Sequence, residues 1–173
     1  GRFRLLLTLA IAVIFVASVG GYLYTRWSAQ RQREVYTDGA RRYTVKASSL
    51  SEGQGTEQPP VTVDFDALLA VNSDIVGWIF CEGTAIDYPV LCGENNDVYL
   101  RRDYEGNANT AGSIFLEAQN RADFSDANTI LYGHNMADGS MFAALQSWQD
   151  QAFYEAHPVI WLLTPKQDYK LLA

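Results

Sequence analysis

Hydrophobic residues are gathered in one long run near the start of the chain and in several short runs after residue 60. Residues 5–25 contain no charged side chain, and the run is as long as the ~20 residues that an α-helix needs to cross a bilayer. Tyr22, Tyr24 and Trp27 lie near its end, where aromatic side chains gather at a membrane interface. The pattern predicts a transmembrane anchor over residues 5–25, preceded by a short basic flank at residues 1–4.

Two other interpretations of the apolar run stay open at this point. The segment Ala17-Ser18-Val19-Gly20 has the small residues of a signal-peptide cleavage site, although a cleaved signal peptide has a shorter apolar stretch of about 7–15 residues. A buried core helix is the second alternative. Orientation is open too, because more arginines follow the run than precede it, which taken alone would place the C-terminal part in the cytoplasm.

The residues that follow the anchor divide into three regions. Residues 26–46 are charged and mixed, and they are compatible with a helix that continues out of the membrane. Residues 47–60 combine small, polar, Pro and Gly residues, which bury too little surface to order themselves, and predict a flexible linker. The folded domain is therefore expected over residues 61–173.

Short apolar runs alternate with polar turns throughout this domain. Asp64 is expected to cap a short amphipathic helix over residues 64–71. Pro89 suggests an edge strand or a bulge. Strands are expected at residues 75–80, 86–91, 112–116, 129–132, 159–163 and from 169 onward, with further helices at 98–103, 141–148 and 151–156. This order predicts a mainly β protein, a mixed β-barrel with short helices, and not a βαβ fold.

Charge and cysteine content narrow the classes of function. The formal net charge of −7 argues against a nucleic-acid partner, because phosphates require basic patches. The chain has 2 cysteines, Cys81 and Cys92, which are too few for a disulfide scaffold, although one bridge between them stays possible. Each cysteine lies beside an apolar run or a turn, so a buried structural role is favoured over a nucleophilic one.

The histidines are the strongest candidates for chemistry, since histidine exchanges protons near neutral pH. His134 follows a predicted strand, and Gly133 permits a sharp turn that would project the imidazole from the end of the sheet into a cleft. His157 ends a predicted helix, where a capping role explains it. A serine hydrolase that uses Ser140 lacks a Gly-x-Ser-x-Gly elbow, and Ser140 fits the N-cap of the next helix. No metal or cofactor is expected, because the histidines are not at ligand spacing.

Several sequence motifs between residues 63 and 165 occur in a characteristic combination. They are Val63-Asp64-Phe65-Asp66-Ala67-Leu68-Leu69, Asn72-x-Asp74-Ile75-Val76-Gly77-Trp78-Ile79, Gly83-Thr84-x-Ile86-Asp87-Tyr88-Pro89-Val90, Asn96-Asp97-x-Tyr99-Leu100, Ala111-Gly112-Ser113-Ile114-Phe115-Leu116 and Asp123-Phe124-Ser125-Asp126-x-Asn128-Thr129-x-x-Tyr132-Gly133-His134-x-Met136-x-Asp138-Gly139-Ser140-Met141-Phe142. The last motif is the most specific. The combination resembles the class B sortases, with the barrel incomplete at its C-terminus.

The resemblance implies an extracytoplasmic cysteine transpeptidase of the Gram-positive cell membrane, held by a single span at residues 5–25. Such an enzyme cleaves a sorting signal after Thr and holds the protein as a thioester. It then passes the protein to an amine of a peptidoglycan precursor, a cross-bridge or a pilin. The family implies no cofactor and no metal.

The resemblance also implies a catalytic His, Cys and Arg. His134 matches the histidine, as general acid and base. The family's Cys closes a Thr-Leu-x-Thr-Cys strand and its Arg follows on a neighbouring strand, and neither context occurs before Ala173. We therefore expect this fragment to be inactive. The alternative is a membrane-tethered binding or scaffolding module, a degenerate sortase in which His134 is structural.

Overall fold

The computed structural model describes residues 1–46 and 58–173, so most of the predicted linker at 47–60 lies outside the described residues. Contacts divide the chain into two compact units, Gly1–Glu34 and Val35–Ala173.

The first unit consists of the larger part of helix α1 (Arg2–Tyr43). Its most apolar stretch has none of its surface buried, and side chains such as Phe3, Phe15 and Leu23 are exposed. The hydroxyls of Thr8 and Ser18 donate to carbonyls one turn earlier, which satisfies them within the helix. Within the described ranges, α1 is the one helix with the length and composition to cross a membrane, so it is a candidate membrane span.

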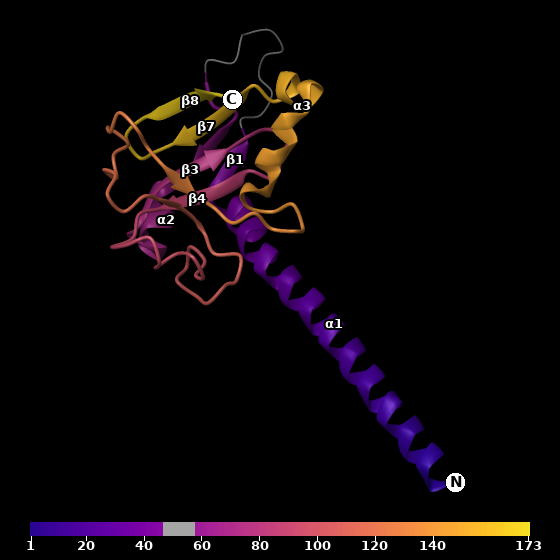
Figure 1. The fold of residues 1–173 in the computed structure, drawn as a ribbon. Helices are drawn as coiled ribbons and strands as arrows, with labels where there is room; N and C mark the ends of the chain where they lie inside the picture. Colours follow the sequence, from indigo (N-terminus) through magenta and orange to yellow (C-terminus); the bar gives the residue numbers. More distant parts are fainter. Residues whose placement is uncertain (47–57) are drawn as a thin grey trace. The chain divides into compact units, whose positions relative to one another are not determined.

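The second unit is built on a mixed six-stranded sheet with the order β6-β5-β4-β3-β7-β8. Four of these strands, β4, β3, β7 and β8, are labelled in Figure 1. The pair β4·β5 is parallel and the other pairs are antiparallel. The six strands are β3 (Ile75–Phe80), β4 (Asp87–Leu91), β5 (Ile114–Leu116), β6 (Leu131–Tyr132), β7 (Val159–Leu163) and β8 (Asp168–Leu172). A separate two-stranded antiparallel sheet is formed by β1 (Thr44–Lys46) and β2 (Val61–Val63). Three short helices complete the unit: α2 (Phe65–Val71), the 3-10 helix η1 (Phe142–Gln149) and α3 (Gln151–Ala156).

The sheet is curled, and the loop between β5 and β6 therefore contacts the edge strand on the opposite side, β8. Tyr169 on β8 donates a hydrogen bond of 3.3 Å to the carbonyl of Asp123 in that loop. The ring of Tyr169 also lies 6.3 Å from the ring of Phe124. Edge strands β6 and β8 do not pair with each other within the described residues, so the sheet forms a half-barrel.

The predicted helix at α2 is confirmed together with its cap, since the Asp64 carboxylate accepts a hydrogen bond from the Ala67 amide at 3.0 Å. The expected helix at residues 98–103 is wrong, because turns occupy residues 98–101 and Arg102 forms an isolated bridge with Ala108. The carbonyls of Tyr99 and Arg101 accept hydrogen bonds from Ser113 and Asn109, so they are not available to a helical ladder. Tertiary hydrogen bonds have replaced local ones.

The position of β4 corrects the edge-strand interpretation of Pro89. β4 lies in the interior of the sheet, between β3 and β5. Its pairing with β5 begins only at Val90, so the missing amide of Pro89 interrupts no rung of that ladder. The irregularity that proline suggested lies on the neighbouring strand, where the register of β3 shifts between Ile75 and Gly77.

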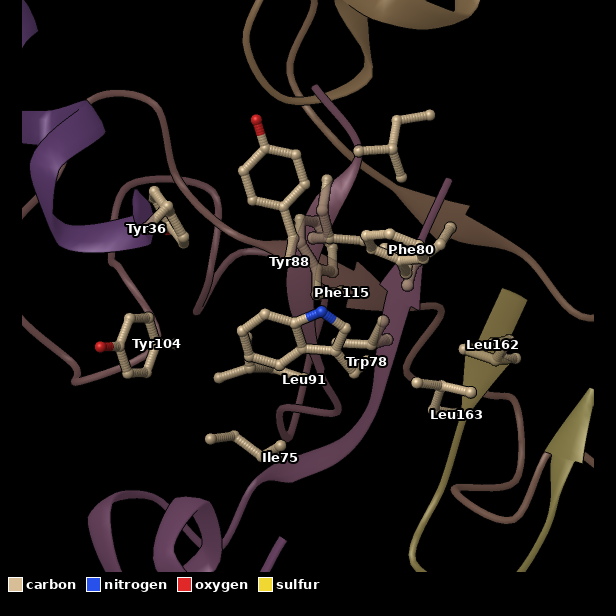
Figure 2. Packing of buried hydrophobic residues seen from close by; sticks show 14 of the residues in the cluster. Tyr36, Ile75, Trp78, Phe80, Tyr88, Leu91, Tyr104, Phe115, Leu162 and Leu163 are labelled. Carbon is tan, nitrogen blue, oxygen red and sulfur yellow. The ribbon is translucent and has the colours of Figure 1, made fainter. Parts of the chain in front are cut away.

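The core lies against the central strands β3 and β4, which are buried on both faces (Figure 2). Trp78 on β3 is fully buried, and its indole Nε1 donates a 2.8 Å hydrogen bond to Oδ1 of Asp87. Burial raises the pKa of the Asp87 carboxyl, and the hydrogen bond from Trp78 opposes that rise. Tyr36 and Tyr43, from the last turns of α1, belong to the same core.

Candidate active site

His134 lies two residues after the end of β6, as the sequence predicted. Gly133 precedes it for a reason other than the sharp turn that we expected, because its backbone is not among the positive-φ glycines. A Cβ at this position would lie 2.5 Å from Cδ1 of Ile114 and 2.6 Å from Cδ2 of Phe142. Glycine is needed here for close packing beside the histidine.

The imidazole of His134 is half-buried and is held by a backbone carbonyl. Its Nδ1 lies 3.0 Å from the carbonyl oxygen of Ala111, in the segment just before β5. A carbonyl oxygen only accepts hydrogen bonds, so Nδ1 carries the proton in this arrangement. The other ring nitrogen, Nε2, is therefore the atom that gains or loses a proton.

A tight loop follows His134 and returns to it. The His134 carbonyl accepts a hydrogen bond from the Phe142 amide at 3.0 Å, and Asn135 forms a bridge with Met141. The Met141 amide donates to the hydroxyl of Tyr88 on β4 at 2.9 Å. The backbone on both sides of the imidazole is thus tied to the sheet.

Ser140 is not an N-cap, which corrects that expectation. Met141 occupies the capping position before η1, and no side chain caps this helix. The Ser140 hydroxyl donates to the carboxylate of Asp138. Because a hydroxyl has a single proton, Ser140 is not donating to His134 as a serine nucleophile would.

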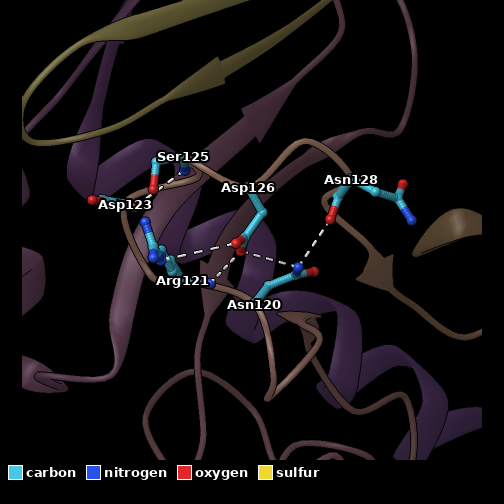
Figure 3. A network of polar contacts seen from close by, with 6 residues as sticks. All are labelled: Asn120, Arg121, Asp123, Ser125, Asp126 and Asn128. Atoms are coloured by element: carbon cyan, nitrogen blue, oxygen red, sulfur yellow. Dashed lines mark hydrogen bonds and ion pairs between the residues drawn. The ribbon is translucent and has the colours of Figure 1, made fainter.

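The loop that leads into β6 is fixed by its own polar side chains (Figure 3). Asp126 accepts hydrogen bonds from the Arg121 amide at 2.6 Å and from Nδ2 of Asn120 at 3.1 Å. Asn120 also donates to the Asn128 carbonyl and accepts from the Ile130 amide, both at 2.9 Å. The polar segment that precedes His134 in the sequence therefore orders the entry into β6, the strand that ends two residues before the histidine.

His157 has the structural role that its position predicted. It is the C-cap of α3, and its amide donates to the Phe153 carbonyl at 2.9 Å. Its Nδ1 lies 2.9 Å from the Glu82 carbonyl oxygen, and its ring lies 4.3 Å from the ring of Phe153. These contacts join α3 to the turn after β3.

The contact of His157 with Gly83 gives a testable prediction. Gly83 has a φ of +75°, and a Cβ there would lie 2.7 Å from Cε1 of His157. Gly139 has a φ of +82° with open space around it. Both alanine variants carry the left-handed strain of about 1–2 kcal/mol, but only Gly83→Ala must also displace His157. We expect Gly83→Ala to lower the free energy of unfolding by at least about 1 kcal/mol more than Gly139→Ala.

Urea denaturation of the full-length protein measures this difference. Equal losses in the two variants would mean that His157 moves aside at no cost and is not fixed by the turn.

Both cysteines are free, so the bridge that the sequence left open is absent. Cys81 is buried, and its thiol donates to the Val159 carbonyl at 3.3 Å. Burial raises the pKa of the Cys81 thiol, and burial together with Asp74 raises the pKa of the Cys92 thiol. A catalytic thiol needs the opposite shift, so these environments suit structural cysteines.

No group of three His, Cys, Asp or Glu side chains is placed to hold a metal ion within residues 1–46 and 58–173. Among these residues, His134, held by the Ala111 carbonyl, is thus the candidate for acid–base chemistry. Ala111 and Tyr88 were not anticipated from the sequence as supports of the histidine. The Ala111-Gly112-Ser113 and Tyr88 positions lie in the motifs that carried the resemblance, which was the one signal for them.

Comparison with known proteins identifies the family of this chain. No protein-family model matches the chain. It is 37% identical over 155 residues to Sortase B of Listeria monocytogenes serovar 1/2a, a match that covers 88% of this chain and 60% of that protein. The chain belongs to the class B sortase family.

Solved structures of the family share this fold. Sortase B from B. anthracis in complex with AAEK1 superposes with a TM-score of 0.70 at 35% identity, covering 84% of this chain and 66% of that one. The Staphylococcus aureus sortase B–substrate complex gives a TM-score of 0.60 at 42% identity, covering 62% of this chain and 50% of that one. The sortase-like fold that the sequence predicted is thus confirmed. The chain spans about 60% of the length of the curated relatives that it matches.

Proposed function

We propose that this chain is the membrane-anchored N-terminal part of a sortase-type cysteine transpeptidase. The parent enzyme cleaves a sorting signal after Thr and joins the released protein to an amine of the cell wall or of a pilin. One observation carries the proposal: His134, the residue that matches the family's histidine, has Nδ1 tied to the Ala111 carbonyl and Nε2 left for proton exchange.

In this proposal His134 is the general acid and base of both half-reactions. As an imidazolium it gives the Nε2 proton to the amine that leaves when a thiolate attacks the Thr carbonyl. As a neutral imidazole it then takes a proton from the incoming amine, which attacks the thioester. The Nδ1–H bond to Ala111 keeps Nε2 as the exchanging atom through both steps.

The nucleophilic Cys and the Arg that steadies the oxyanion are proposed to lie in the part of the relatives that this chain does not match. The raised thiol pKa values of Cys81 and Cys92 support this view, because neither environment favours a thiolate. Without the thiol no acyl-enzyme forms. The 173-residue chain is therefore proposed to be inactive by itself.

The proposed partners are a sorting-signal peptide and an acceptor amine. The S. aureus relative has been solved as a substrate complex, which supports peptide binding by the family. Helix α1 is proposed to hold the protein in the cell membrane as a single span, with the domain outside the cytoplasm. The exposed apolar side chains of its first unit support the anchor.

Thioester trapping tests the proposal. The full-length protein and the 173-residue chain are each incubated with sorting-signal peptides from surface proteins of the same organism, and intact masses are measured. We expect an acyl adduct on the full-length protein and none on the shorter chain. An adduct on the shorter chain would contradict its proposed inactivity, and a full-length protein that binds these peptides without an adduct would favour the non-catalytic module.

A further inference from the structure

Tyr36 is a buried residue of α1, within the second unit, whose hydroxyl reaches the segment that holds His134. Its side chain is 5% exposed, and its hydroxyl donates to the carbonyl of Gly112. Burial raises the pKa of the Tyr36 phenol, so the hydroxyl stays protonated and remains a donor. Gly112 directly follows Ala111, whose carbonyl accepts from His134.

The peptide unit that carries the Ala111 carbonyl is held on its other side as well. Its N–H belongs to Gly112 and donates to the Asn109 carbonyl at 3.1 Å. The Ala111 amide donates to Oδ1 of Asn109 at 2.9 Å. Asn109 is itself 5% exposed, so these bonds lie away from competing solvent.

Gly112 is the pivot between this peptide unit and the next. It adopts a φ of +57°, and a Cβ at this position would lie 2.5 Å from the Leu100 carbonyl oxygen. Glycine is thus required, and glycine also restricts its own backbone least. Contacts from elsewhere in the fold must therefore fix the conformation. Ser113 holds the far side, with its amide bonded to the Tyr99 carbonyl at 3.0 Å, and Tyr36 holds the Gly112 carbonyl.

Tyr36 also contacts the second support of the histidine loop. Its ring lies 5.4 Å from the ring of Tyr88 in an edge-to-face arrangement. The Tyr88 hydroxyl accepts from the Met141 amide at the end of the loop that begins at His134. One side chain of α1 therefore contacts both structures that hold the imidazole.

We propose that Tyr36 is a positioning residue for His134, acting through the carbonyl of Gly112 and the ring of Tyr88. This proposal rests on the proposed catalytic role of His134. The hydroxyl of Tyr36 keeps the Ala111 carbonyl aimed at Nδ1, and so keeps Nε2 facing the reacting groups. Tyr36 itself touches no substrate.

The test is Tyr36→Phe in the full-length enzyme, because the ring is kept and only the hydroxyl is lost. We expect kcat for transpeptidation to fall about three- to tenfold, the range of one neutral hydrogen bond, with KM unchanged. The matched control is Tyr104→Phe. Tyr104 is equally buried, its ring lies 5.9 Å from that of Tyr36, and its hydroxyl contacts Glu105 at 3.4 Å. We expect Tyr104→Phe to leave kcat unchanged.

A second readout is independent of catalysis. The ¹⁵N chemical shifts of His134 report which ring nitrogen carries the proton, and we expect Nδ1–H in the parent protein and a mixture of tautomers in Tyr36→Phe. If both the tautomer and kcat are unchanged in Tyr36→Phe, or if Tyr104→Phe lowers kcat equally, the proposal is overturned. If His134→Ala retains activity, the catalytic assignment fails instead, whatever the tautomer shows.

Discussion

Replacing His134 with alanine in the full-length protein is expected to lower kcat for transpeptidation by at least about 10²-fold, the lower end of what a positioned general acid–base contributes. The fold should survive, because among residues 1–46 and 58–173 the imidazole bonds only to the Ala111 carbonyl, and it is only half-buried. Peptide cleavage and product formation, followed by mass spectrometry, measure the loss. Thermal unfolding of the same samples measures the stability.

His157→Ala is the matched control, since it removes the chain's other histidine from a partly buried site. This imidazole packs on the ring of Phe153 in α3 and bonds to the Glu82 carbonyl in the turn after β3, so its loss should lower stability while leaving kcat within about twofold. Full activity in His134→Ala would refute the catalytic assignment. An equal loss of kcat in both variants would show that general loosening of the fold, and not proton transfer, is responsible.

Trp78→Ala is expected to lower the free energy of unfolding by about 3–5 kcal/mol, as truncation of a buried tryptophan does. Trp78 is fully buried on the central strand β3, so a cavity would form in the middle of the core. The variant also removes the indole donor of Asp87, which leaves a partly buried carboxylate without that hydrogen bond. The loss is a large share of the ~5–15 kcal/mol that a domain possesses.

Urea denaturation of the full-length protein measures this loss. Trp27→Ala is the control, because Trp27 lies on α1 in the first unit and is 53% exposed. We expect this control to change the unfolding of the domain by less than about 0.5 kcal/mol. A loss below about 1 kcal/mol in Trp78→Ala would mean that the core repacks around the vacancy and that Trp78 is not its centre.

Local sequence patterns correctly predicted the helices and strands that depend on residues close together in the sequence. The β-branched and aromatic run of β3 and the apolar run of β7 were predicted with the bounds that the structure has, and Asp64 caps α2 as expected. The position of His134 just after a strand was predicted from the order of strand, glycine and histidine, and its role as general acid and base stays a prediction that rests on the resemblance. The helix expected at 98–103 failed because its carbonyls bond to residues about ten positions later.

The supports of His134 escaped prediction because they come from distant parts of the chain. Ala111 contributes a backbone carbonyl, which no residue type reveals, 23 positions before the histidine. Tyr36 lies 76 positions before Gly112, on a helix whose earlier residues gave the signal of a membrane anchor. The sequence around Tyr36 is charged and follows the apolar run, so nothing in it predicts that this tyrosine is buried in the core. Only the fold brings these groups together.

The strand order also determines when the domain can fold during synthesis. The central strand β3 pairs with β4 soon after it is made, but its other neighbour is β7, and Trp78 lies opposite Leu163 in that pair. A nascent chain must therefore be extended to Leu163 before β3 has both neighbours, and until then one edge of this central strand stays unpaired. Such non-local pairing slows folding and favours association between unfinished chains.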